Sequence, residues 1–178
     1  MILGAKEIYR LIKENKLVVH PLFDDAIREN GVDLRIGGEY AVYTHSGIVV
    51  NPCKLNDSEM RRLFRTVSED EIPIPPKSFV LLTTYEYVKL PDDVVGLVNL
   101  RSTLARLGLI IPPTIIDAGF EGNVTIEVVN VSSNTIMLKK FMRFLHVVLA
   151  RTEGAVPYEG KYKGQTGVRP PKGLKEEC

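Results

Sequence analysis

Several features that mark other classes of protein are scarce or missing in this sequence. Its 178 residues carry 23 Lys and Arg against 22 Asp and Glu, a formal net charge of +1. There is thus no broad cationic field of the kind that binds a nucleic-acid polymer. No apolar run approaches the length of a membrane span, and the N-terminal MILGAKEIYR lacks the apolar core of a signal peptide. We therefore expect a cytoplasmic protein whose partner is neither a membrane nor a nucleic-acid polymer.

Cysteine and histidine are also rare. The two cysteines, Cys53 and Cys178, cannot build a disulfide framework, and this low number suggests a reducing compartment. The three histidines, His20, His45 and His146, are widely spaced. Zinc-dependent nucleobase deaminases need H-x-E and P-C-x-x-C motifs, and the sequence contains no C-x-x-C. The sequence therefore predicts no zinc and no other metal bound by side chains.

What is present is a series of short strand patterns separated by turn signals. A chain of 178 residues can bury one substantial core, so we expect one domain spanning residues 1–178. Amphipathic spacing predicts a helix over 5–15, whereas the charged segment 54–71 predicts a short helix or a surface excursion. Strand patterns occupy residues 17–21, 30–40, 78–88, 94–100, 123–130, 135–139 and 143–151. This pattern indicates a mainly β barrel or sandwich with a few helices.

Two of these strand patterns contain charged or titratable residues whose function the pattern does not decide. Between residues 30 and 40, Asp33 and Arg35 alternate with apolar residues. The residues alone favour a solvent-facing position at a strand edge, whereas the family resemblance described below implies that Asp33 and Arg35 support the site of a neighbouring subunit. His146 interrupts an otherwise apolar strand pattern, which is more typical of a hydrogen-bonded core residue than of a ligand.

The stretch from Arg101 to Asn130 gathers most of the candidate chemistry. Its first part, RSTLAR, predicts a short helical turn that ends at Gly108. Ser102 and Arg106 are four residues apart, so the turn places them on one face. A hydroxyl, a guanidinium and the backbone N–H groups at the start of a turn form a plausible cradle for phosphate or another anion.

The second part of this stretch, residues 123–130, alternates as a strand. Valine and isoleucine occupy one face, while Thr125 and Glu127 lie on the other. If the apolar face packs into the core, Thr125 and Glu127 share the face of a pocket.

Together these two parts, RSTLARLGL and IDAGFEGNVTIEVVN, resemble the dCTP deaminases of the dUTPase superfamily, in their archaeal type. The resemblance extends from NGVDLRIG at residues 30–37 to GKYKGQTG at 160–167, with four blocks in the family's order. It implies a distorted jelly-roll β-barrel of the dUTPase type, assembled as a homotrimer with its sites at subunit interfaces.

The resemblance also implies an activity, which is zinc-independent deamination of dCTP to dUTP and ammonia in the synthesis of dUMP and dTTP precursors. Glu127 would activate the water that attacks cytosine C4, while Ser102 and Arg106 would position it and stabilise the developing charge. Mg²⁺ would bind through the triphosphate and not the ring. The implied nucleotide contacts are Arg101, Ser102, Thr103, Leu104, Ala105, Arg106, Asp117, Thr125, Ile126, Glu127, His146, Tyr158, Lys161 and Gln165.

The final segment, residues 154–178, is rich in Gly, Pro, Tyr and Lys and has no strong period. Such a segment is usually a loop or a disordered end. Tyr158, Lys161 and Gln165 match phosphate-contacting residues of the resembling family, which implies a mobile tail that closes over the nucleotide. Closure of this kind excludes water from a reaction.

Three alternatives accompany this prediction. A dUTPase ends in a glycine-rich, arginine-containing motif and lacks a glutamate at the position of Glu127, so the sequence favours cytosine deamination. Asp117 would then hold the deoxyribose 3′-hydroxyl. Pro112 and Pro113 replace a histidine-containing segment of bacterial relatives, which leaves a bifunctional enzyme that releases dUMP and pyrophosphate open. A non-catalytic nucleotide-binding trimer would not need Glu127.

Overall fold

The structure is a computed structural model that describes residues 1–44, 47–174 and 178. His45 and residues 175–177 of the predicted tail lie outside the described residues. The helices are α1 (Ala5–Lys13), α2 (Asp57–Arg62) and α3 (Ser102–Arg106). The strands are β1 (Val18–His20), β2 (Ile27–Arg28), β3 (Gly31–Tyr43), β4 (Phe64–Ser68), β5 (Glu71–Ile74), β6 (Phe79–Lys89), β7 (Val94–Leu100), β8 (Leu109–Ile110), β9 (Thr114–Ile116), β10 (Glu121–Asn130), β11 (Ile136–Lys139) and β12 (Arg143–Arg151).

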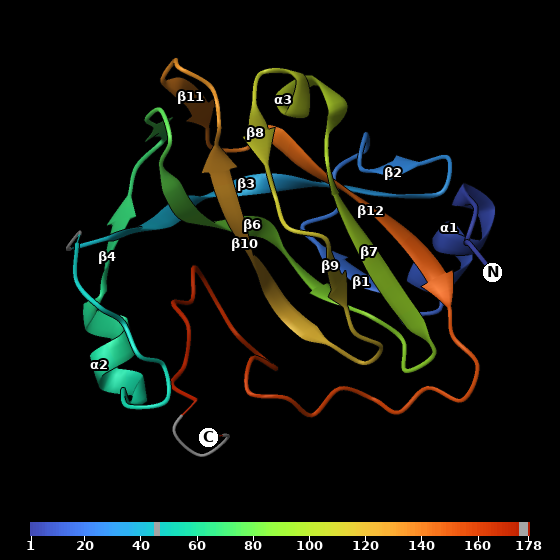
Figure 1. Ribbon diagram of the computed structural model, residues 1–178. Coiled ribbons are helices and arrows are strands. Elements are labelled where there is room, and N and C mark those ends of the chain that lie inside the picture. The colour runs from blue at the N-terminus through green and yellow to red at the C-terminus, as the bar shows by residue number, and fades with distance from the viewer. Residues whose placement is uncertain (45–46, 175–177) are drawn as a thin grey trace.

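Ten of these strands form one curled, antiparallel sheet (Figure 1). Its main path runs β8-β10-β6-β3-β12-β7-β9, with β1 paired to β6 and both β2 and β4 paired to β3. β5 and β11 form a separate antiparallel pair. This arrangement confirms the predicted mainly β, barrel-like fold with a few short helices. No helix in the described part of the chain is long and apolar enough to span a membrane.

The core sits inside the curl of the sheet and is made by the predicted alternation. Along β10, every second residue is buried, including Val124, Ile126 and Val128. At the other side of the molecule, α1 directs Ile8 and Leu11 into the same core. Burial of one face of β10 therefore turns the opposite, polar face away from the core.

Two strand predictions need correction. β3 lies between β6 and β12 in the sheet, and Asp33 is only 4% exposed, so the solvent-facing edge position is wrong for Asp33. The error arises because both faces of β3 are covered, which period-two alternation does not reveal. In the segment 54–71, α2 is the predicted short helix, but β4 follows it and pairs with β3.

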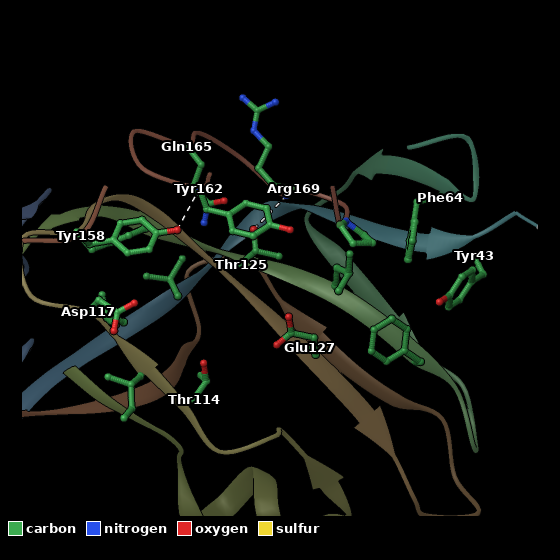
Figure 2. A pocket seen from close by; sticks show the side chains of 17 residues that line it. Tyr43, Phe64, Thr114, Asp117, Thr125, Glu127, Tyr158, Tyr162, Gln165 and Arg169 are labelled. Atoms are coloured by element: carbon green, nitrogen blue, oxygen red, sulfur yellow. Dashed lines mark hydrogen bonds between the residues drawn. The ribbon is translucent and has the colours of Figure 1, made fainter. Parts of the chain in front are cut away.

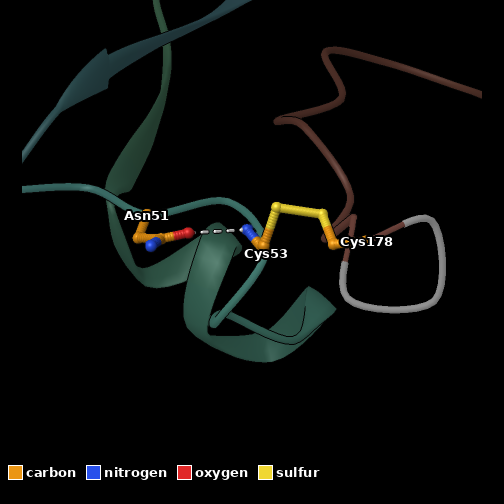
Figure 3. The surroundings of a disulfide bond; sticks show 3 residues. All are labelled: Asn51, Cys53 and Cys178. Atoms are coloured by element: carbon orange, nitrogen blue, oxygen red, sulfur yellow. Dashed lines mark hydrogen bonds between the residues drawn. A yellow bond between two sulfur atoms is a disulfide. The ribbon is translucent and has the colours of Figure 1, made fainter.

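The two cysteines are paired, which the sequence analysis did not predict. Cys53 and Cys178 form a disulfide across 125 residues, which ties the tail to the loop before α2 (Figure 3). The backbone N–H of Cys53 donates a hydrogen bond of 3.0 Å to the side chain of Asn51. Two cysteines this far apart in sequence meet only through tertiary structure, so the sequence alone gave no sign of their pairing.

Candidate active site

The floor of the candidate site is the polar face of β10. Thr125 and Glu127 are half-buried and line a cavity of about 420 Å³ (Figure 2). Antiparallel pairing with β6 holds this part of the strand, with Thr125 opposite Thr83 and Glu127 opposite Leu81. A cavity of this volume is in the range that binds small molecules.

The walls of the cavity differ at its two ends. At one end the aromatic rings of Tyr43, Phe64 and Phe79 gather, with ring centroids 4.4 Å apart for Tyr43 and Phe64. At the other end Asp117, which follows β9, presents its carboxylate (Figure 2). The site thus combines an apolar wall with a few polar groups, as small-molecule sites commonly do.

The tail forms the roof. The backbone N–H of Asn123 donates to the carbonyl of Gln165 at 2.9 Å, and the side-chain amide of Gln165 donates to the carbonyl of Asn123 at 2.8 Å. Further along, the N–H of Arg169 donates to Thr125 Oγ1 at 3.0 Å (Figure 2). Gly122 permits this approach, because it has φ +142° and a Cβ there would lie 2.7 Å from the carbonyl oxygen of Gln165.

The RSTLAR segment folds as predicted but lies elsewhere. Arg101 caps α3 in an extended conformation, and the turn stops before Gly108, which has φ +97°. Ser102 and Arg106 are exposed, whereas Leu104 is buried. Figure 1 shows α3 at the end of the sheet away from the tail, and neither Ser102 nor Arg106 lines the cavity.

The charges around the cavity are unbalanced. Glu127 and Asp117 bring carboxylates to it, and Arg169 is the one cationic residue among the described residues that line it. Figure 2 shows the guanidinium of Arg169 pointing away from Glu127. One chain therefore offers this cavity a possible general base but few cations for a phosphate-bearing ligand.

Comparison with known proteins adds the family. A family model described as dCTP deaminase-like matches residues 2–152. The chain belongs to this family. Its relatives include the dCTP deaminase of Pyrobaculum aerophilum, 64% identical over 178 residues and covering all of both chains. The dCTP deaminase of Caldivirga maquilingensis is 58% identical over 180 residues, covering 100% of this chain and 99% of the relative.

Solved structures support the fold. The 2′-deoxycytidine 5′-triphosphate deaminase of Agrobacterium tumefaciens superposes with a TM-score of 0.67 at 19% identity, over 85% of this chain. The match covers 48% of the Agrobacterium protein, so this chain spans about half of it. A variant of the dUTPase of Staphylococcus bacteriophage 80alpha, with dUpNHpp, gives a TM-score of 0.51 at 17% identity over 83% of this chain and 89% of that one. The fold is thus that of the dUTPase type.

In this dCTP deaminase-like chain, the predicted site residues fall into two groups. Those that line the cavity are Asp117, Thr125, Glu127, Tyr158 and Gln165. Those away from it are Arg101, Ser102, Thr103, Leu104, Ala105, Arg106 and His146, while Lys161 lines a neighbouring cavity. The Ile126 side chain is 1% exposed and faces the core, which leaves only its backbone for a ligand.

His146 is hydrogen-bonded, as expected for a histidine in an apolar strand. Its Nδ1 lies 2.9 Å from Asp33 Oδ1, and its side chain keeps 26% exposure. Among the described residues, no group of three or more His, Cys, Asp or Glu is arranged to hold a metal ion.

Several lining residues were not predicted. They are Tyr43, Phe64, Phe79, Tyr162 and Arg169, together with apolar neighbours. Tyr162 lies next to Lys161 in the tail block, and its hydroxyl accepts the N–H of Lys172 at 3.1 Å. The tyrosine and lysine pattern of the tail was the available signal for Tyr162. No local pattern connects Phe64 to Glu127, because their proximity depends on the pairing of β4 with β3.

Proposed function

We propose that this protein deaminates dCTP to dUTP and ammonia without zinc, in the supply of dUMP and dTTP precursors. The observation that carries the proposal is the carboxylate of Glu127, which projects from β10 into the cavity of a chain 64% identical to a named dCTP deaminase. Thr125 beside it and Asp117 at the end of the cavity supply hydrogen-bonding groups for the nucleoside.

The proposed reaction uses Glu127 as a proton carrier. Its carboxylate takes a proton from water while the water oxygen bonds to C4 of the cytosine. Glu127 passes this proton to ring nitrogen N3, where it stays. It then carries the second proton from the new C4 hydroxyl to the exocyclic amine, so that the C4–N bond breaks, the C4 carbonyl forms and ammonia leaves. Ser102 and Arg106 position the water and stabilise the charge of the tetrahedral intermediate. The product is dUTP.

We further propose that the working site forms between subunits of a homotrimer. Ser102 and Arg106 lie outside the cavity of their own chain, which itself has few cations. Exposed apolar side chains surround α3 and its neighbouring groove: Leu97 37%, Leu107 54%, Ile110 52% and Ile115 56%. A contiguous apolar surface of this kind is typical of a subunit interface. Burying it against the cavity of a neighbour brings Arg106 to Glu127.

The substrate enters as the magnesium complex of dCTP, with Mg²⁺ held by its phosphates. Asp117 is proposed to bind the 3′-hydroxyl of the deoxyribose.

The tail is proposed to move and to close over the triphosphate with Tyr158, Lys161 and Gln165. Gln165 suits this role, because it lines the cavity and its side-chain amide has a second N–H, besides the one donated to Asn123, that can donate to a phosphate oxygen. The remaining contacts come from the Arg101–Arg106 segment, the Ile126 backbone and His146.

We place this activity in the cytoplasm. The proposed substrate is a charged nucleotide that does not cross a bilayer unaided. A disulfide is unusual in a cytosolic protein, but intracellular proteins of hyperthermophilic archaea are a known exception. The archaeal type of the sequence fits that exception.

Product analysis tests the activity. The purified protein is incubated with Mg²⁺ and dCTP, dUTP or CTP in separate reactions, and ammonia, dUTP, dUMP and pyrophosphate are measured. We expect ammonia and dUTP from dCTP, with dUTP left intact. Release of dUMP and pyrophosphate from dCTP would identify the bifunctional enzyme, and hydrolysis of dUTP alone would identify a dUTPase. No turnover of any substrate would leave a nucleotide-binding trimer.

Mixing two inactive variants tests the shared site. In trimers co-assembled from Glu127→Gln and Arg106→Ala chains, some interfaces combine an intact Glu127 with an intact Arg106. Random assembly in equal amounts makes about a quarter of the sites complete, so activity should return to about that fraction of wild type. Mixtures as inactive as either variant would overturn the shared site and leave the deaminase assignment to the product analysis.

A further inference from the structure

A buried carboxylate lies behind α3, on the central strand β3. Asp33 is 4% exposed and pairs in register with His146 of β12. Its Oδ1 is 2.9 Å from His146 Nδ1, and its Oδ2 is 3.4 Å from Arg143 Nη1 and 3.7 Å from Arg101 Nη1. One carboxylate thus gathers two arginines and a histidine from two separate segments, β12 and the start of α3. Burying an ionised carboxylate is costly unless it is paired in this way.

One of these partners, Arg101, begins α3. Its N–H donates to the carbonyl of Phe144 on β12 at 3.0 Å, and its own carbonyl accepts from Leu104 and Ala105 at 3.0 and 3.2 Å. Asp33 meets the guanidinium of the same residue. A helix of five residues is too short to hold its own orientation, so these contacts fix the direction of the turn.

The charges of this cluster leave a cationic excess. Asp25 accepts a hydrogen bond from the Arg35 guanidinium, which lowers the pKa of Asp25, and lies 3.4 Å from Arg143 Nε. Three arginines, Arg35, Arg101 and Arg143, therefore face two carboxylates. Arg101 keeps 35% of its side chain exposed, so its guanidinium can reach an outside ligand while Asp33 holds it. Positioned guanidinium groups are well suited to phosphate oxygens.

We propose that Asp33 is a positioning residue for binding of the substrate's triphosphate, acting through Arg101. The proposal rests on the proposed function. Asp33 touches neither the nucleotide nor the reacting water. It holds the Arg101 guanidinium and the start of α3 in the orientation that receives phosphate, with Arg143 and His146 as its other partners.

The test compares Asp33→Asn with a matched control, Glu86→Gln. Both changes turn a buried carboxylate into an amide of similar shape, and Glu86 lies on the adjacent strand β6 with its Oε2 accepting the Arg35 N–H at 2.8 Å. Asp33→Asn should raise the KM for dCTP about tenfold or more with a smaller change in kcat, since loss of one charged contact has that size. Glu86→Gln should leave KM within about twofold of wild type.

A double-mutant cycle separates positioning from general loss of structure. If Asp33 acts through Arg101, the variant with both Asp33→Asn and Arg101→Ala should have the same KM as Arg101→Ala alone. If the increase in KM of the double variant equals the product of the two single increases, Asp33 acts independently of Arg101, and the proposal is overturned. An unchanged KM in Asp33→Asn would overturn it as well.

The assay also separates this proposal from the proposed function. Deamination by wild type and Glu86→Gln, together with a normal KM in Asp33→Asn, would remove only the positioning role. Inactive wild type would remove the function. If Asp33→Asn fails to fold because the cations lose their carboxylate, Asp33→Asn with Arg143→Gln removes one excess charge. Its KM should still exceed that of Arg143→Gln alone by about tenfold, and equal values would overturn the proposal.

Discussion

The cavity above β10 and the turn at α3 hold the two halves of the proposed chemistry, and they are built differently. Glu127 stands on a strand paired along its length, under a tail attached by backbone hydrogen bonds. Ser102 and Arg106 stand on a five-residue helix, exposed and surrounded by exposed apolar side chains. The cavity half is complete within one chain, whereas the α3 half presents the exposed apolar surface that the proposed subunit contact requires.

The strongest test of this difference is removal of the proposed base. Glu127→Gln should lower kcat by about two to four orders of magnitude, the usual contribution of a general base, while dCTP binding is retained. Steady-state kinetics and equilibrium binding of dCTP measure the two effects separately. Turnover close to wild type would show that the β10 half does not supply the base.

The matching change in the other half is Arg106→Ala. We expect a loss of about two to three orders of magnitude in kcat with some loss of binding, because the proposed role of Arg106 is to stabilise developing charge. Combined with Glu127→Gln, it should add little, since both residues act on one water. Kinetics of the single and double variants measure this coupling. If the loss of kcat in the double variant equals the product of the two single losses, the two residues do not act in one shared site.

The third test addresses what holds the tail over the cavity. Cys53→Ser should lower the free energy of unfolding by about 2–4 kcal/mol, because the disulfide no longer restrains the unfolded chain. Denaturant titration measures this, with Cys178→Ser and reduced wild type as controls that should agree with Cys53→Ser. Variants as stable as the oxidised wild type would contradict a stabilising disulfide.

The smallest effect concerns Glu86, which is buried on β6. Burial raises the pKa of Glu86 from 4.5 to about 7, and the hydrogen bond from the Arg35 N–H offsets only part of this shift. A raised pKa means that its contribution to stability is full below pH 4.5 and is lost as the pH rises through about 7. The loss is at most about 3 kcal/mol.

Denaturant titration from pH 4 to 8 measures this dependence, with Glu86→Gln as the comparison. In the variant, the free energy of unfolding should fall less between pH 4.5 and 7 than in the wild type, because Glu86 no longer titrates. An equal fall in the two proteins would contradict the shifted pKa of Glu86.

The sequence predicted the parts of the site that depend on local pattern. The alternation along β10 fixed the faces of Thr125 and Glu127, since burial of valine and isoleucine decides the orientation of every other residue. Gly108 ended α3 as expected, because glycine adopts positive φ without strain.

The parts that the sequence did not reveal depend on contacts between distant segments. Phe64 lines the cavity because β4 pairs with β3, and the charged segment around β4 had no strand pattern strong enough to show this. Asp33 looked like an ordinary alternating polar residue, yet its partners come from residues 101, 143 and 146. The disulfide likewise joins residues that no spacing rule connects.

That disulfide changes what the tail can do as a mechanical element. Its backbone continues from β12 at one end, and Cys178 is bonded to Cys53 at the other, so both ends of the oxidised tail are attached to the rest of the protein. The whole tail therefore cannot move away from the cavity, and nucleotide exchange requires movement of its central part or entry of the nucleotide below it. A single proteolytic cut between the two cysteines leaves the two fragments joined until a reductant is added.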